Sequence, residues 1–453
     1  MRFINKPFTK RLFQLAIPVM LTQVGQVSVN LFDNVIVGNL LGADALASVS
    51  LANSVFFSFF VLALGFSLAI PPLVSEAQSQ NDHDKIDLIF RHGFVLNMAV
   101  GLILTIGIFV GMPLLYHVGQ PEKIIPDTIS YLCITTISIL PFMAFQALRE
   151  FSEGLSFTIG VTKATIIANV INVVLNYIFI KGLFGIHPMG VDGSAYASLI
   201  ARIFMMIFLY FILRQNKGTR RYIKNFSLRF HFFRKSMFKK MLKLGFPTAM
   251  QLFFEVTAFA GAAFICGLVS TKDIAGNQIA QIMASFTFNL CMGFSVASTV
   301  MIGNRLGESK YKELRAVGIN NLKMAFLFML MCGIIFVVFR DTLPTFFTKK
   351  SDVDVIHLAS KLLIIAALFQ LSDGIQVTAL GLLRGIQDVK IPSIITFVAY
   401  WVLTIPLGYF LCVHQNMGAT GMWIAFGLGL TFSASLLVYR FLYLSKKLIS
   451  IEK

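Results

Sequence analysis

Twelve long apolar runs constrain this chain more than any other feature of its sequence. They fall at residues 12–38, 50–76, 90–115, 127–152, 161–182, 190–214, 241–268, 277–303, 318–342, 355–383, 391–413 and 418–445. Each reaches about 20 residues, the length that a helix needs to cross a bilayer. Backbone groups in lipid must pair within their own segment, and the runs lack the period-2 alternation of barrel strands. The sequence therefore predicts an all-α membrane protein with twelve transmembrane helices.

The composition and the missing motifs exclude several classes of protein. Only 13% of the residues are charged and 57% are hydrophobic, whereas soluble domains carry roughly 25% charged residues. The five cysteines lie in apolar runs without a CxxC pair, which argues against a disulfide framework or a metal site. The sequence has no GxxxxGK[ST] motif, no nucleophile elbow and no metalloprotease helix. We therefore expect neither an ATP-driven pump nor an enzyme, and no cofactor.

The two halves of the chain repeat each other. Three segments return in the same order at an offset of 228 or 229 residues: 15–18 as 244–247, 65–67 as 293–295, and 189–193 as 417–421. Six helices per half start and end on the same side, so the repeats are expected to be parallel, with a central cavity between two six-helix lobes. The expected division is an N-lobe at 1–214, a basic cytoplasmic linker at 215–240 and a C-lobe at 241–453.

Basic residues are unevenly distributed along the chain. Eleven Lys and Arg, and no acid, lie at 214–243, and both terminal segments and the loop after the eighth run are also basic. With twelve helices these segments share one side, which the positive-inside rule makes cytoplasmic. We interpret the basic link as topology control and a solvated linker rather than a site for anionic lipid or nucleic acid. The basic residues 1–11 precede a run too long for a signal peptide, so a retained first helix is expected.

Three acids lie in the interior of an apolar run and not near one of its ends, namely Asp33, Glu255 and Asp373. A carboxylate at bilayer depth costs a few kcal/mol, so it usually faces a cavity, an ion or a partner. No basic residue lies nearby in sequence to neutralise any of the three. We therefore favour a cation or proton site over buried acids that only hydrogen-bond to neighbouring hydroxyls and amides.

Other embedded polar residues leave alternatives open. Asn172 and Asn176 are four residues apart and share one helix face. Their amides suit either the coordination of a small cation or interhelical hydrogen bonding. Arg202, in the sixth run, is either functional, snorkelling to the interface or paired locally.

Taken together, these positions resemble the multidrug and toxic compound extrusion (MATE) family over nearly the whole chain. The matching positions are Leu15, Pro18 and Asp33 in the first run; Pro247, Gln251 and Glu255 in the seventh; the 381–388 segment GLLRGIQD after the tenth; Asn172, Asn176 and residues 190–198 in the fifth and sixth. The resemblance implies two six-helix lobes in a V-shaped bundle, and export of organic cations coupled to inward Na⁺ or H⁺. Glu255 and Asp373 make the chain similar to NorM-like members.

The resemblance also implies site residues in each lobe. Asp33, Asn172, Asn176 and Ser198 correspond to an N-lobe cation or proton-coupling site, and Glu255 and Asp373 to a C-lobe cation or substrate site. Ser198 stands where some members carry Thr, and Asn176 where some carry Asp, which leaves Asp33 as the only carboxylate of its site. Phe369 stands where some NorM-like members carry Tyr, so a hydroxyl ligand is in doubt there.

The expected protein is a multidrug antiporter of the bacterial inner membrane with both termini cytoplasmic. It would act by alternating access as a monomer in lipid, on small-molecule drugs and toxic organic cations, without a nucleic-acid partner. Na⁺ and H⁺ both remain open as the coupling ion. The alternative is a lipid-linked precursor flippase of the same superfamily, which would need basic side chains for pyrophosphate.

The acids do not follow the repeat. At an offset of 229, Asp33 aligns with Ala262 and Glu255 with Gln26. At an offset of 231, Asp373 aligns with Phe142. We therefore expect two inequivalent polar sites, one in each half.

Overall fold

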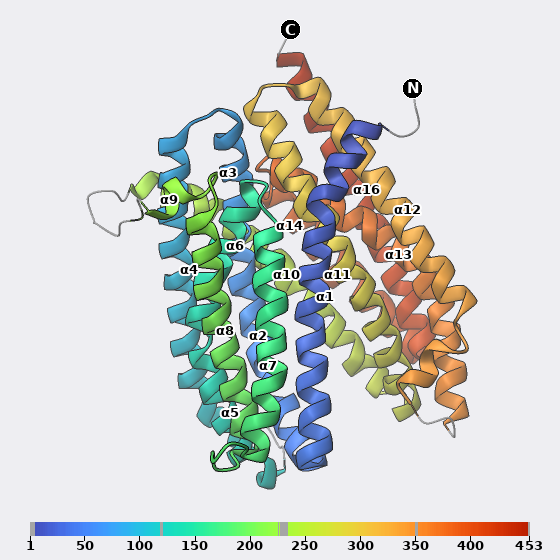
Figure 1. The fold of residues 1–453 in the computed structure, drawn as a ribbon. Coiled ribbons are helices and arrows are strands. Elements are labelled where there is room, and N and C mark those ends of the chain that lie inside the picture. Colours follow the sequence, from blue (N-terminus) through green and yellow to red (C-terminus); the bar gives the residue numbers. More distant parts are fainter. Residues whose placement is uncertain (1–4, 118–120, 225, 227–233, 349–351, 452–453) are drawn as a thin grey trace. The chain divides into compact units, whose positions relative to one another are not determined.

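The computed structural model of the chain describes residues 5–117, 121–224, 226, 234–348 and 352–451. These residues form helices and short connections, without a strand (Figure 1). Twelve helical spans within them are long and apolar enough to cross a membrane. This confirms the all-α fold with twelve transmembrane helices.

The chain packs as two compact units. Unit 1 contains Met1–Met20 and Met250–Lys453, and unit 2 contains Leu21–Ala249. The boundaries therefore fall inside two long helices, α1 (Lys6–Leu41) and α10 (Lys235–Gly267). The lobe boundaries expected from sequence stay a prediction, because they divide the chain into repeats and not into packing units.

In unit 2, α6 packs against α4 and α8, α2 packs against α4 and α5, and α8 packs against α5 and α7. Its elements are α2 (Ala43–Ser67), α3 (Ile70–Ser79), α4 (His83–Gly111), η1 (Met112–His117), η2 (Glu122–Ile124), α5 (Ile125–Ile137), α6 (Ile139–Gly154), α7 (Ile159–Lys181), α8 (Gly190–Gln215) and α9 (Arg220–Lys224). Its core joins Val49, Phe60 and Met143 to residues of α8.

Unit 1 is organised around α13, which packs against α11, α12 and α16. Its further elements are α11 (Thr271–Gly307), α12 (Tyr311–Val338), η4 (Leu343–Phe346), α13 (Val353–Gly385), α14 (Lys390–Phe397), η5 (Val398–Thr404), α15 (Ile405–Tyr409), η6 (Phe410–His414) and α16 (Ala419–Ile451). The first part of α1 belongs to this unit, where Leu12, Leu15 and Met20 join the core around Phe294.

Prolines explain why some expected spans are interrupted. Pro71 and Pro72 open α3, where the missing N–H groups leave no hydrogen bond unmade. Pro406 lies at the start of α15, and the wider π-helical segments η5 and η6 flank it on both sides. In contrast, Pro18 and Pro247 lie inside continuous helices. Proline therefore interrupts some of these helices, whereas others continue through a proline.

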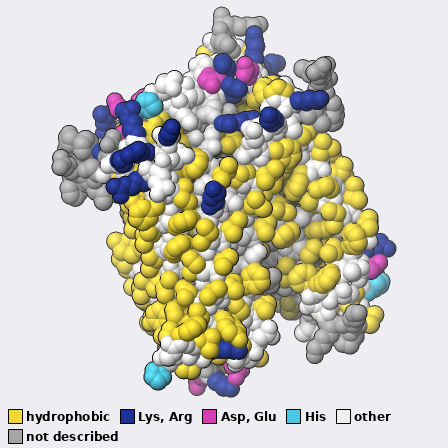
Figure 2. Space-filling model, in the orientation of Figure 1, with side chains coloured by type: hydrophobic (Ala, Val, Ile, Leu, Met, Phe, Trp, Pro, Cys, Tyr) yellow, Lys and Arg dark blue, Asp and Glu magenta, His cyan; other side chains and the backbone are white. Residues whose placement is uncertain are grey.

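Apolar side chains cover the middle of the helices, and Lys and Arg gather near α9 in unit 2 (Figure 2). The exposed basic residues there are Arg214, Lys217, Arg220, Arg221 and Lys224. They belong to the link that the sequence predicts to be basic. Residues 225 and 227–233 of that link lie outside the described residues.

Candidate functional site

The four N-lobe residues expected from sequence meet in unit 2, on three helices. Asp33 of α1 accepts a hydrogen bond from Asn176 Nδ2 of α7 at 2.7 Å. Its other oxygen accepts from Ser198 Oγ of α8 at 3.2 Å. Asn172 Nδ2 donates to the same Ser198 oxygen at 3.1 Å, so hydrogen bonds connect all four side chains. Asp33 is only 5% exposed, so its carboxylate depends on these partners.

Local helix geometry positions the cluster. Asn172 and Asn176 lie one turn apart on α7, and Asn176 Nδ2 also approaches the Asn172 backbone and side-chain oxygens at 3.2 and 3.3 Å. The α8 helix begins at Gly190, whose φ of 54° is the left-handed conformation that glycine adopts easily. Ser198 then lies two turns into α8, opposite α7. The sequence motif around residue 190 therefore sets the approach of Ser198 to Asp33.

The donor set of this cluster fits a small hard cation. It offers a carboxylate, a hydroxyl and two amide oxygens, the ligand types that such cations prefer. Asn176 Oδ1 is buried and accepts no hydrogen bond within the described part of the chain. A buried acceptor without a donor is costly, and a bound cation or a water molecule would satisfy it. The cluster is therefore able to hold Na⁺, or a proton on Asp33.

Arg202 lies one turn beyond Ser198 on α8 and is held locally. Its Nη1 donates to Ser138 Oγ, and its guanidinium lies over the rings of Phe56 and Phe142 at 5.0 and 5.4 Å. It interacts electrostatically with Asp33. Arg202 therefore partly offsets the charge of the only carboxylate in the cluster.

The two C-lobe acids lie in unit 1. Tyr400 of η5 donates from its hydroxyl to Glu255 Oε1 of α10 at 3.2 Å. Gln376 of α13 donates from Nε2 to the Tyr400 hydroxyl oxygen at 3.3 Å. Asp373, one turn before Gln376, interacts electrostatically with Glu255 and is only 2% exposed. The structure therefore brings both predicted acids into one buried region.

This acid pair is incompletely satisfied. No hydrogen bond to the Asp373 carboxylate is formed by the residues that the structure describes. Gln376 Oε1 and both amide atoms of Gln370, all buried, also lack hydrogen-bond partners in the part of the chain that the structure describes. Gln370, Asp373 and Gln376 follow at three-residue spacing, so they share one face of α13. This face offers oxygen atoms to a cation and no Lys or Arg among its electrostatic partners within the described ranges.

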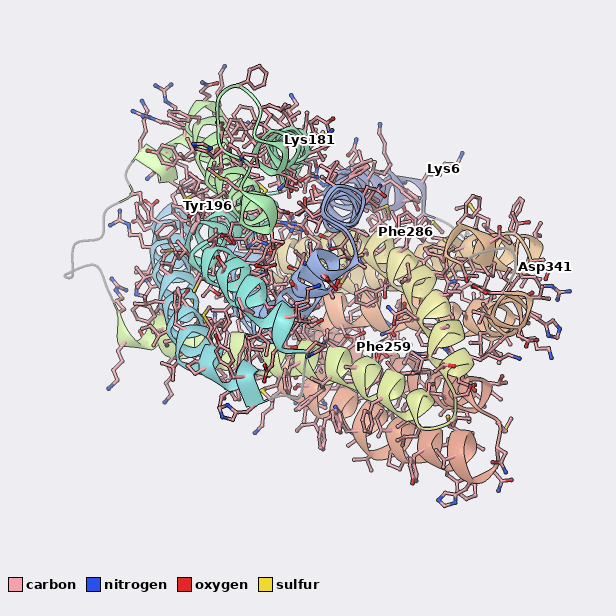
Figure 3. All side chains as sticks on the ribbon, turned by 90° about the horizontal axis from the view of Figure 1, so that it is seen from below. Lys6, Lys181, Tyr196, Phe259, Phe286 and Asp341 are labelled. Carbon is pink, nitrogen blue, oxygen red and sulfur yellow. The ribbon has the colours of Figure 1, made fainter. Side chains whose placement is uncertain are left out.

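Tyr400 and Gln376 were missed by sequence reasoning. Phe369 packs in the apolar core, with its ring 5.4 Å from that of Trp423 and 6.4 Å from that of Phe259, which Figure 3 labels. The hydroxyl that faces Glu255 comes instead from Tyr400. A phenol inside an apolar run is a weak signal that could have identified it, because a buried Tyr usually finds a hydrogen-bond partner.

Known proteins resemble this chain over nearly its whole length. The MatE family model matches residues 18–178 and again 247–410, two matches that begin 229 residues apart. The multidrug resistance protein NorM of Photobacterium profundum is 33% identical over 446 residues, which cover 95% of this chain and 94% of that protein. The multidrug resistance protein MdtK of Yersinia pseudotuberculosis is 30% identical and covers 97% of this chain and 96% of its own.

Solved structures share the fold. An outward-facing multidrug resistance MATE family transporter of the MOP superfamily matches with a TM-score of 0.88 at 21% identity, covering 97% of this chain and 96% of that chain. A eukaryotic MATE transporter matches with a TM-score of 0.87 at 18% identity and covers 98% of both chains. The fold of these structures agrees with the twelve helical spans of this chain.

Proposed function

The chain belongs to the multidrug and toxic compound extrusion family, and on that premise we propose that it is a multidrug efflux antiporter. It exports amphipathic, often cationic, small molecules in exchange for Na⁺ or H⁺. Membership of the family makes it a multi-pass membrane transporter and not an enzyme. The curated relatives NorM and MdtK are named as multidrug resistance proteins, which supports the substrate class.

The observation that carries this proposal is the buried cluster around Asp33. Its single carboxylate is surrounded by the Ser198 hydroxyl and the Asn172 and Asn176 amides, and Asn176 Oδ1 has no donor among the described residues. A proton or a Na⁺ ion is small enough to bind such a cluster, whereas an organic cation is not. The coupling ion is therefore assigned to Asp33.

The acids of unit 1 supply a second function. Glu255 and Asp373 are two buried carboxylates with no basic electrostatic partner in the described part of unit 1. Their negative charge suits a cationic substrate or a further coupling cation. The aromatic side chains nearby, including Tyr400 and Phe259, whose ring centroids are 6.2 Å apart, suit the flat apolar faces of such substrates.

Coupling requires that the ion and the substrate favour different conformations. A ligand shifts a conformational equilibrium only by its difference in affinity for the two states. The coupling ion at Asp33 would favour the state that releases substrate outward, and its dissociation inward would restore the state that binds substrate. A change from 1:99 to 99:1 needs about 5.5 kcal/mol of differential binding, so the ion must be bound much more tightly in one state.

The membrane and its orientation complete the proposal. The chain acts as a monomer in the bacterial inner membrane, in contact with lipid and not with nucleic acid. The Lys and Arg near α9, and those at 305–315, support a cytoplasmic side for the loops that carry them and for both termini.

Efflux from proteoliposomes tests this function. Ethidium efflux is measured under an imposed Na⁺ gradient and then under an imposed pH gradient, and we expect one of the two to drive it. Asp33→Asn keeps an oxygen that accepts from Asn176 and presents an NH2 group to the Ser198 hydroxyl oxygen, so the variant should fold. It should lose ion-driven efflux, because it removes the carboxylate, and Asp373→Asn should lose it as well. Asp127→Asn, at an exposed position in the first turn of α5, makes the same chemical change away from the site and should transport normally.

Two results would overturn the assignment. One is full ion-driven efflux by both Asp33→Asn and Asp373→Asn. The other is rescue of a flippase-deficient strain by a protein that shows no efflux under either gradient.

A further inference from the structure

A polar stripe runs along one face of α7 and ends at the Asp33 cluster. Its members follow at intervals of three or four residues: Thr162, Thr165, Asn169, Asn172 and Asn176. This spacing places them on one helix face over about 21 Å, at 1.5 Å per residue. Four of them are buried, all except Asn169, which is partly exposed. A buried polar face of this length in an apolar helix needs partners along its whole course.

The stripe faces α1. Thr22 Oγ1 of α1 donates to Thr162 Oγ1 at 3.1 Å, at the end where α7 begins. Further along, a Cβ added to Gly25 would lie 2.8 Å from Asn169 Nδ2 and 3.5 Å from the methyl carbon of Thr165. The glycine therefore permits a close approach of the two helices at the middle of the stripe.

Beside Thr22, the adjacent residue of α1 contacts a buried ion pair. Arg149 Nη2 of α6 donates to Gln23 Oε1 at 3.3 Å, and Arg149 Nε donates to Glu153 Oε1 at 2.8 Å. The Arg149 and Glu153 side chains are only 6% and 1% exposed. Glu150 is also buried and interacts electrostatically with Arg149.

Several buried atoms along this route have no hydrogen-bond partner among the described residues. They are Thr165 Oγ1 in the stripe, Gln26 Nε2 on α1, and Gln146 Oε1 and Glu153 Oε2 on α6. Isolated polar atoms of this kind are usually satisfied by ordered water. They lie on α7, α1 and α6, which the Thr22–Thr162 and Arg149–Gln23 hydrogen bonds link to one another, and such a set of atoms suits a hydrated path.

We propose that this stripe is the route by which the coupling cation moves within unit 2 between Asp33 and the Arg149–Glu153 ion pair. Thr165 and Asn169 provide intermediate oxygen atoms, and Glu153 is the carboxylate at the cytoplasmic end. The Glu153 carboxylate attracts the cation there, while its ion pair with Arg149 keeps the cation from being held too tightly. This inference rests on the proposed function, because it assigns a path to the ion that drives export.

Two substitutions remove polar groups from the path with little change in shape. Thr165→Val deletes the hydroxyl that lacks a partner, and Glu153→Gln keeps an oxygen for Arg149 but removes the charge. The matched control is Thr136→Val on α5, where a fully buried hydroxyl also lacks a partner among the described residues but lies off the stripe. The assay is ethidium efflux from proteoliposomes under a Na⁺ gradient and, separately, under a pH gradient.

Thr165→Val and Glu153→Gln should each slow efflux under the effective gradient by about tenfold, since the first removes an oxygen atom and the second a negative charge from the path of the cation. Ethidium binding to the purified protein should be unchanged, and Thr136→Val should transport at the wild-type rate. A network that serves only to hold the helices together would alter the three variants' thermal stability without singling out the two path variants in transport.

The outcomes separate the path from the function on which it rests. If neither gradient drives efflux by the wild-type protein, both proposals fail. If wild-type efflux is ion-driven and Asp33→Asn loses it, while both path variants match Thr136→Val, the path alone is overturned. If Thr165→Val also loses ethidium binding, its fold is damaged and its efflux does not test the path. In that case Glu153→Gln tests the path, and normal efflux by this variant refutes it.

Discussion

The hydroxyl of Tyr400 links the two polar elements of unit 1, so its removal is an informative perturbation. It donates to Glu255 Oε1 at 3.2 Å and accepts from Gln376 Nε2 at 3.3 Å. Tyr400→Phe deletes both hydrogen bonds and leaves the ring in place. Gln376 is fully buried and its Oε1 already lacks a partner among the described residues, so the variant would leave both ends of this amide unsatisfied.

The expected loss of stability follows from these contacts. Leaving a buried donor or acceptor unsatisfied costs about 1–3 kcal/mol, and both bonds are longer than the ideal, which favours about 1 kcal/mol for each of the two. We expect unit 1 to be destabilised by about 2 kcal/mol. For a cooperative unit of about 200 residues, this lowers the melting temperature by about 4–8 °C.

Thermal unfolding in detergent, followed by the fluorescence of a thiol-reactive dye at the buried cysteines, measures this effect. Tyr439→Phe is the matched control, because Tyr439 is 68% exposed and no hydrogen bond of its hydroxyl is found within the described ranges. Replacing both partners by apolar residues removes the unsatisfied donor, so Tyr400→Phe combined with Gln376→Leu should be more stable than Tyr400→Phe alone. The reasoning is refuted if Tyr400→Phe melts with the control, or if the double variant is the least stable of the set.

Two further predictions concern helix packing and site charge. Gly381→Ala would place a Cβ against the Ser295 carbonyl oxygen of α11, so it should destabilise unit 1 by about 1–3 kcal/mol in the same assay. Gly107→Ala, where no atom lies within 4 Å of the added Cβ, should be neutral or stabilising by about 0.5–1 kcal/mol. Arg202→Met keeps the apolar contacts but removes a cation near Asp33, so the apparent KM for the coupling ion should fall by about tenfold in gradient-driven efflux; an unchanged or higher KM would contradict the charge argument.

Three members of the N-lobe cluster were foreseeable because each has a local signal in the sequence. Asn172 and Asn176 share a helix face by their spacing, and Asp33 is an acid in an apolar run. What no local pattern supplies is the contact of Asp33 with Ser198, residues 165 positions apart in the sequence. The resemblance to the family placed them together, and the structure brings them within hydrogen-bonding distance.

The contacts of Tyr400 and the unit boundaries were not foreseeable. An apolar run that contains a tyrosine gives no indication of which acid the phenol will meet, since that depends on the packing of α10, η5 and α13. The boundaries at Met20 and Ala249 fall inside continuous helices. An uninterrupted apolar helix carries no sequence mark for the point at which its packing partners change.

The departures from the repeat explain why the two polar sites differ in charge. Gln26 occupies the position that corresponds to Glu255, and Phe142 the position that corresponds to Asp373. Phe142 lies under the Arg202 guanidinium, so where unit 1 has an acid, unit 2 has an aromatic face that holds a cation. The site in unit 2 therefore combines one carboxylate, Asp33, with one nearby arginine, whereas the site in unit 1 has two carboxylates and no basic electrostatic partner for either among its described residues. A cation that binds at Asp33 must tolerate a neighbouring positive charge, which favours a small ion bound by oxygen atoms at short range. The uncompensated acids of unit 1 impose no such limit, and a large organic cation with diffuse charge is able to satisfy them.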